Sequence, residues 1–187
     1  MKNNIKLVLF VLYISFYLFA CGQSKDAVKK ANEVNEKKAD ANMVSENIAE
    51  FLVKSADARM MDLQEGELAF TKGSIKEVRE YGALMIKDQA ILLEEIKKIA
   101  GNKNITLPSS ISDQKKKGRE NLSEKEGKEF DEKFIKMMKI DHERDLKLFE
   151  KAKDFDDMET KLFANKYLPM IKSHLDKVII IEEIVEY

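Results

Sequence analysis

From Met43 onward, apolar and polar residues follow one another with the period of an α-helix. Apolar side chains recur every three or four positions, and the whole sequence holds only two prolines. This pattern predicts long helices over residues 44–71, 75–100, 125–153 and 158–183, and a short helix over about 113–122. Four amphipathic helices joined mostly by short turns favour an all-α, antiparallel four-helix bundle, with the short extra helix between helices two and three.

The apolar stripes also predict which side chains form the core. The expected inward positions are Leu52, Ala56, Met60, Leu63 and Phe70 in the first helix; Val78, Met85, Leu92, Ile96 and Ile99 in the second; Phe130, Phe134, Met138, Leu146 and Phe149 in the third; and Tyr167, Ile171, His174, Val178, Ile181 and Val185 in the fourth. Ser74, with Glu77 three residues later, predicts a capping box at the start of the second helix. Pro169 should kink the fourth helix or remove one of its backbone hydrogen bonds.

The N-terminus has the pattern of an export signal. Lys2 and Lys6 precede an uncharged, mostly apolar run over residues 7–20. The run is shorter than the roughly 20 residues of a membrane-spanning helix, but it fits the apolar part of a secretory signal, about 7–15 residues long. It ends in LFAC, with Ala20 before Cys21, which resembles the lipobox of bacterial lipoproteins. We therefore predict a signal peptide over residues 1–20 and lipidation of Cys21.

Several expectations follow from this N-terminus. Cys21 is the only cysteine, so no disulfide can form within the chain. Gly22 follows it in place of the Asp that holds enteric lipoproteins at the inner membrane, which favours the outer membrane, facing the periplasm or the surface. Residues 21–42 are polar and predict a flexible tether, which leaves 43–187 as the bundle domain. The membrane, reached through Cys21, is the one partner that the sequence predicts.

Charge excludes one class of partner. Loss of Lys2 and Lys6 with the signal leaves 31 basic and 34 acidic side chains, with the two signs interspersed. Such a balance lacks the basic surface that binds nucleic acid. It indicates solvated helix faces and points to no particular protein or small molecule as a partner.

Both histidines of the chain lie on predicted inward faces. Asp141 precedes His142 on the third helix, His174 lies on the fourth, and Asp88 has a similar place on the second. Bundle cores hold metal sites built from such groups. The alternative is a structural polar core, in which each histidine bonds a facing Asp, Gln or Tyr. This alternative is favoured because neither histidine has the Glu-x-x-His spacing of di-iron bundles. Motifs of catalytic triads, phosphate loops and dinucleotide sites are absent, so no catalytic residue is predicted.

Five segments carry a resemblance to a known family. They are DLQEGELAFTKG (62–73), IKEVREYGALMIKDQ (75–89), ITLPSS (105–110), GKEFDEKFIKMMKIDHERDLKLFEKA (127–152) and FANKYLPMIKSHL (163–175). In this order they resemble the bacterial "predicted outer membrane protein" family, domain of unknown function 4142. The resemblance covers about residues 44–182. It implies a ferritin-like four-helix bundle that is often exported.

The resemblance also implies a Glu pair on the first helix, Asp-His pairs on the second and third, and a histidine on the fourth. Asp62 and Gln64 lie near the positions of the expected Glu pair. Gln89 follows Asp88 where the second helix would have its histidine, and Gln is a poor ligand for transition metals. This departure favours the structural polar core. The candidate residues for a core polar cluster or a metal site are Asp62, Gln64, Asp88, Gln89, Asp141, His142 and His174.

Two functions remain open at this point. The first is a lipid-anchored, non-enzymatic helical bundle with a binding or stress-protective role in the cell envelope, and it needs no cofactor. The second is a metal-binding or oxidoreductase-type protein that uses the Asp and His residues of the bundle core.

Overall fold

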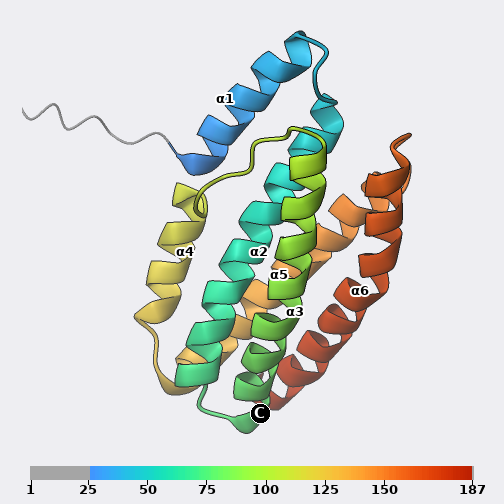
Figure 1. Ribbon diagram of the computed structural model, residues 1–187. Coiled ribbons are helices and arrows are strands. Elements are labelled where there is room, and N and C mark those ends of the chain that lie inside the picture. Colours follow the sequence, from blue (N-terminus) through green and yellow to red (C-terminus); the bar gives the residue numbers. More distant parts are fainter. Residues whose placement is uncertain (1–25, 187) are drawn as a thin grey trace, which may run out of the picture.

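The computed structural model describes residues 26–186, and these residues form helices without any strand. The helices are α1 (Ala27–Asp40), α2 (Glu46–Lys72), α3 (Lys76–Asn102), α4 (Asp113–Ser123), α5 (Gly127–Ala152) and α6 (Met158–Glu186). Figure 1 shows the four long helices, α2, α3, α5 and α6, side by side. The predicted all-α bundle is confirmed, and the expected ends of its helices agree with the observed ones to within three residues. The predicted signal, Cys21 and the first few residues of the predicted tether, 22–25, lie outside the described residues.

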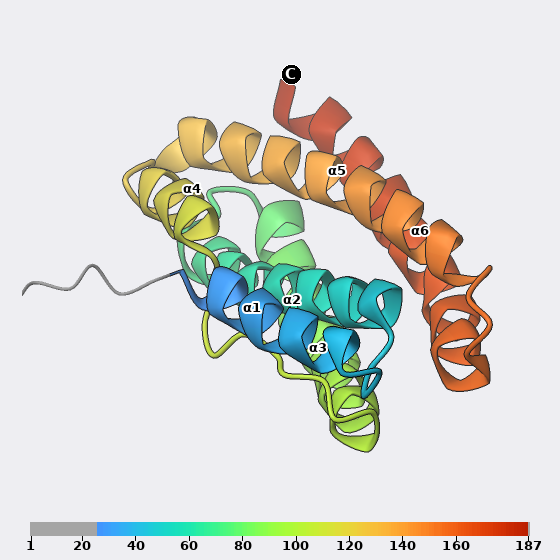
Figure 2. The same cartoon turned by 90° about the horizontal axis from the view of Figure 1, so that it is seen from above.

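Two helical hairpins build the bundle. α2 packs along α3 and α5 packs along α6, while α2 also contacts α5 and α3 contacts α6. The short helix α4 lies against α2 and α5 on the outside of the bundle (Figure 2). None of the helices in residues 26–186 is long and apolar enough to cross a membrane.

The core has two apolar parts. One includes Phe51, Phe149 and Phe163, whose rings make edge and tilted contacts, with Phe51 and Phe149 centred 5.2 Å apart. The other includes Phe130 and Phe134. Between the two parts, each long helix turns polar side chains inward, so that a layer of buried charged and polar groups crosses the middle of the bundle.

The predicted stripes are correct for three of the long helices and displaced on α2. The expected positions of α3 and α6 are buried, and on α5 only Leu146 is partly exposed. On α2, Phe70 is 54% exposed, and Met60 and Leu63 are only partly buried. The prediction followed the large apolar side chains, whereas the true inward face of α2 carries charged groups in its middle.

Helix α1 corrects the predicted tether. Residues 27–40 were assigned to a flexible tether because they lack large apolar side chains, but they form a helix that packs on α2. It docks through the small Ala31 and the buried Asn35. The Asn35 amide exchanges two hydrogen bonds of 2.8 Å with the backbone of Thr106, and Lys38 Nζ donates to the Asn104 carbonyl at 2.7 Å. Polar bonds to the loop before α4 thus replace the apolar contacts that the sequence lacks.

The start of α3 is capped by another helix. Ser74 was expected to cap it with its own side chain, but the N-cap residue is Ile75 and makes no side-chain capping bond. Instead Asp131 of α5 accepts hydrogen bonds from the backbone N–H groups of Ser74 (3.0 Å) and Ile75 (3.2 Å), and from the Ser74 hydroxyl. Pro169, the residue expected to disturb the fourth helix, lies inside α6, and the helix continues through it.

A close approach of α2 and α3 depends on two glycines. A Cβ atom at Gly82 would lie 2.6 Å from the Phe70 nitrogen and 2.7 Å from the Gly66 oxygen, both backbone atoms of α2. Backbone atoms cannot move aside as a flexible side chain can, so the hairpin tolerates no side chain at this position.

We expect Gly82→Ala to lower the free energy of unfolding by about 3 kcal/mol, because the two helices must separate to admit the methyl group. Gly101→Ala is the matched control on the same helix, since a Cβ there meets nothing within 4 Å. The control should leave stability unchanged or raise it by up to about 1 kcal/mol. Urea unfolding of both variants is the measurement, and equal stabilities would contradict the close approach.

Candidate functional site

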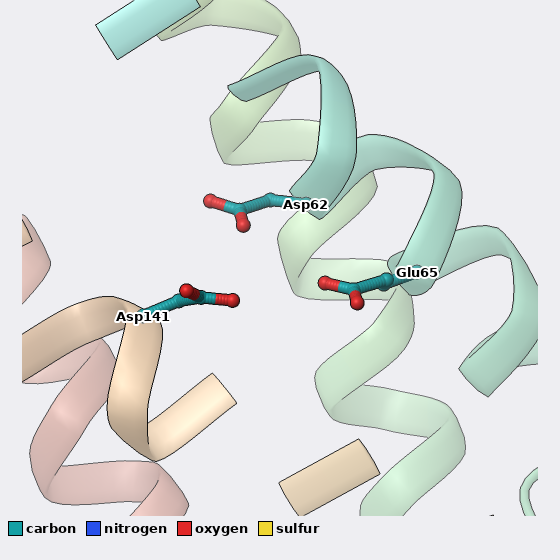
Figure 3. Close-up of side chains that lie close together, drawn as sticks. All are labelled: Asp62, Glu65 and Asp141. Carbon is teal, nitrogen blue, oxygen red and sulfur yellow. The ribbon is translucent and has the colours of Figure 1, made fainter. Parts of the chain in front are cut away.

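Three carboxylates meet in the polar layer between the two apolar parts of the core. Asp62 and Glu65 lie three residues apart on one face of α2, and Asp141 faces them from α5 (Figure 3). One ligand atom from each of the three lies within 4.8 Å of the others. Asp62 is 1% and Glu65 0% exposed. Neither carboxylate accepts a hydrogen bond from any described residue. We call these three residues the carboxylate trio.

A buried arginine supplies the nearest positive charge. Arg59, one turn before Asp62 on α2, is completely buried. Its Nη2 lies 3.0 Å from Asp62 Oδ2 and also bonds Asp145 of α5. The charges of three carboxylates, Asp62, Asp145 and Asp141, act on this one guanidinium, and its Nε and Nη1 have no hydrogen-bond partner among the described residues. The layer is therefore short of positive charge when all its acids are ionised.

The pKa values of the trio reflect this shortage. Burial, opposed by Arg59 and reinforced by Asp145, raises the pKa of Asp62 to about 7. Burial and the charges of Asp62 and Asp141 raise the pKa of Glu65 well above its usual 4.5. Burial also raises the pKa of Asp141, although Lys115 and Arg144 oppose the rise. Protons thus hold part of this cluster neutral near pH 7.

The two histidines form a second part of the polar layer. Their ring centres are 5.5 Å apart, and both side chains are buried. His142 Nε2 lies 2.6 Å from the Tyr81 hydroxyl, and His174 Nε2 lies 2.9 Å from Asp88 Oδ2. Burial lowers the pKa of both imidazoles, and of His142 the more strongly. At neutral pH they are neutral groups that fix the packing of α3, α5 and α6.

Comparison with known proteins gives a family and no function. The model of the family described as a domain of unknown function (DUF4142) matches residues 33–180. The chain belongs to this family. No curated protein and no solved structure matches it, so a ferritin-like fold stays what the resemblance implies. The match reaches into α1, in keeping with the packing of that helix on the bundle.

In this DUF4142 protein the polar layer holds most of the predicted candidates. Asp62 and Asp141 meet in the trio, and Asp88, His142 and His174 lie in the histidine part. Gln89 is completely buried, with its Nε2 3.6 Å from Met85 Sδ and its Oε1 unbonded among the described groups. Gln64 is only partly buried, and Glu65 takes the inward position beside Asp62 instead.

Four residues of the layer are not among the candidates predicted from the sequence. They are Arg59, Glu65, Tyr81 and Asp145. A signal for two of them was present, because Arg59 and Glu65 continue the spacing of Leu52 and Ala56 along α2 as far as the buried Ala69. A charged residue at an inward position interrupts the apolar stripe of a helix, and the sequence does not show which residue pairs with it. Asp145 of α5 is that partner for Arg59, and only folding places it there.

We expect Glu65→Gln to stabilise the metal-free DUF4142 bundle, and the gain to grow with pH. The pKa of Glu65 is higher in the folded than in the unfolded chain. Stability therefore falls as pH rises from 4.5 toward the folded pKa, by up to about 1.4 kcal/mol per pH unit, and Gln removes this loss. Urea unfolding with a chelator, from pH 4.5 to 8, tests this. The exposed Glu67→Gln is the control, and a Glu65→Gln gain independent of pH would contradict the assignment.

Proposed function

We propose that this protein binds a divalent metal ion in the core of its helical bundle, through the carboxylates of Asp62, Glu65 and Asp141. The observation that carries the proposal is Glu65, a completely buried carboxylate that points at two others and has no hydrogen-bond partner among the described residues. Burying an ionised group without a partner costs several kcal/mol, as a rough scale. A cation between the three side chains would remove that cost.

The donor set indicates which ions would fit. Carboxylate oxygens suit hard cations such as Mg²⁺, Ca²⁺ and Mn²⁺. Without a metal ion, protons neutralise part of the negative charge, because burial raises the pKa of all three carboxyl groups. A metal ion would displace these protons, so binding should be tighter at pH 8 than at pH 6. The histidines would support the site from beside it, as neutral groups that keep α3 and α6 in position against α5.

This proposal reverses the preference that the sequence suggested. The metal site considered from the sequence combined Asp and His residues, and Gln89 in place of a histidine argued against it. The trio keeps Asp62 and Asp141 of those candidates, adds Glu65 and needs no histidine. A purely structural polar core is the competing interpretation, and it predicts that no metal binds.

We expect the soluble chain without its signal, residues 22–187, to bind about one Mn²⁺ and to gain stability from it. At a Mn²⁺ concentration 100 times the Kd, the gain is about 2.7 kcal/mol, which is a rise of several degrees in Tm. Glu65→Gln and Asp141→Asn should lose most of the binding while staying folded. Equilibrium dialysis with metal analysis and thermal unfolding are the measurements. The exposed Glu67→Gln is the control, and wild-type protein that binds no Mn²⁺, Mg²⁺, Ca²⁺ or Fe²⁺ would leave the core purely structural.

We also propose that the bundle acts at a membrane surface, held there by acyl chains on Cys21. The support is the sequence: the Lys-flanked apolar run over residues 7–20 and the LFAC ending. Because buried acyl chains contribute about 0.8 kcal/mol per CH₂, several chains anchor a protein where one does not. With α1 beginning at Ala27, the spacer between Cys21 and the first helix is short. The metal site would then stay close to that surface.

We expect Cys21→Ala to abolish lipid attachment without changing the fold, since the described bundle begins after this position. Cells given labelled palmitate should label the wild-type chain and not the variant, and the variant should keep the size of the uncleaved precursor. Circular dichroism of the purified variant checks the fold. Equal labelling of both chains, or cleavage of the variant after Ala20, would refute the lipobox.

A further inference from the structure

A groove on the outside of the bundle leads to the carboxylate trio. It has a volume of about 780 Å³ and lies between α2, α4 and α5. Asp141 lines it, whereas Asp62 and Glu65 are enclosed by the bundle. A ligand in the groove would therefore reach the trio at Asp141. A volume of this size is typical of sites for small molecules, which occupy roughly 300–1,000 Å³.

Four basic side chains line the groove, and one of them is paired with the trio. Arg144 Nη1 lies 2.6 Å from Asp141 Oδ1, and 64% of the Arg144 side chain is exposed. Lys115 of α4 lines the groove, and its charge opposes the rise in pKa of all three trio carboxyls. Lys54 and Lys147 line it as well. Lys115 Nζ lies 3.7 Å from Asp57 Oδ2 and Lys54 is paired with Glu50, so a negatively charged ligand would share these basic groups with the acids beside them.

The acidic side chains of the groove already have partners. Asp57 Oδ1 accepts a hydrogen bond of 2.7 Å from the backbone of Ser112, and Asp145 is bonded to Arg59. Asp141 is paired with Arg144, but a cation in the trio would compete for the Asp141 oxygens and leave the Arg144 guanidinium available. Cation binding would thus prepare the groove for an anion.

The floor of the groove is apolar. Met61 of α2 and Met137, Ile140 and Leu148 of α5 line it beside the basic groups. A lining that combines apolar side chains with a few charged groups suits a ligand that has an apolar body and one charged head, more than it suits an inorganic ion.

Coordination chemistry links the groove to the trio. Hard cations take six to eight oxygen ligands, as a rough range, and three carboxylates leave some positions for other oxygens. Building on the proposed metal site, we propose that a small organic carboxylate sits in this groove, completes the coordination of the bound cation beside Asp141, and is held by Arg144 and Lys115. A carboxylate fits because its two oxygens pair with a guanidinium through two parallel hydrogen bonds. Its apolar body lies on the methionine and leucine side chains of the floor.

The test measures whether the two ligands strengthen each other. Mn²⁺ binding to the chain of residues 22–187 is measured with and without benzoate, and benzoate binding with and without Mn²⁺, with protein-free blanks. We expect about a ten-fold gain in each affinity, and the same factor in both directions because the coupling is reciprocal. Water-proton relaxation by the bound Mn²⁺ gives an independent readout, and it should fall as benzoate displaces coordinated water.

Two variants and a second anion make the test specific. Arg144→Gln should reduce the coupling factor to about one, whatever it does to the Mn²⁺ affinity itself, while Lys172→Gln on the exposed side of α6 should keep the ten-fold factor. Inorganic phosphate, which has no apolar body, should couple more weakly than benzoate.

Each other outcome counts against a defined part of the proposal. Mn²⁺ binding that benzoate leaves unchanged would overturn the carboxylate site while leaving the metal site standing. Coupling that survives in Arg144→Gln would place the anion outside the groove. Phosphate coupling as strong as that of benzoate would overturn the role of the apolar floor. Absence of Mn²⁺ binding with and without benzoate would instead refute the metal site on which this inference depends.

Discussion

The structure depends on keeping charge in the middle of a bundle that excludes water. Arg59 is completely buried, and it bonds Asp145 of α5 and faces Asp62 on its own helix. Removing one partner of such a buried pair generally costs about 3–5 kcal/mol, because the other charge is left without compensation. The pairing therefore fixes how α2 lies against α5. The positions of Glu65 and Asp141 then follow, because Glu65 is one turn from Asp62 and Asp141 one turn from Asp145.

The carboxylate trio and the two histidines contribute differently to the charge of the polar layer. The carboxylate trio has an excess of negative charge. Protons reduce this charge in the metal-free protein, and we propose that a cation reduces it in the cell. In the histidine part the two imidazoles are neutral, because burial lowers the pKa of His142 and His174. Tyr81 and Asp88 each fix one ring nitrogen, so the imidazoles hold three helices in register without adding charge. The two apolar clusters lie on either side of the polar layer.

The elements could be predicted from the sequence more fully than the site. The predicted stripe over Val78, Met85 and Leu92 is apolar and is buried as expected. On α2 the same reasoning chose Phe70, which is 54% exposed, over the charged face that is buried. Hydrophobic period identifies an inward face only where that face is apolar. Helix α1 was missed for a related reason, since Asn35 docks it through hydrogen bonds to Thr106 and not through apolar area.

By itself the sequence determined the number, order and limits of the long helices, because local spacing of apolar residues and breaks at glycine or proline are properties of short segments. It also determined the lipobox pattern at Cys21 and the inward place of both histidines. The tertiary structure alone decided the site. Asp62 and Glu65 are neighbours along α2, but Asp141 is distant in the chain and joins them only when α5 packs on α2. A buried charge can be recognised only with its partners, and the fold supplies them.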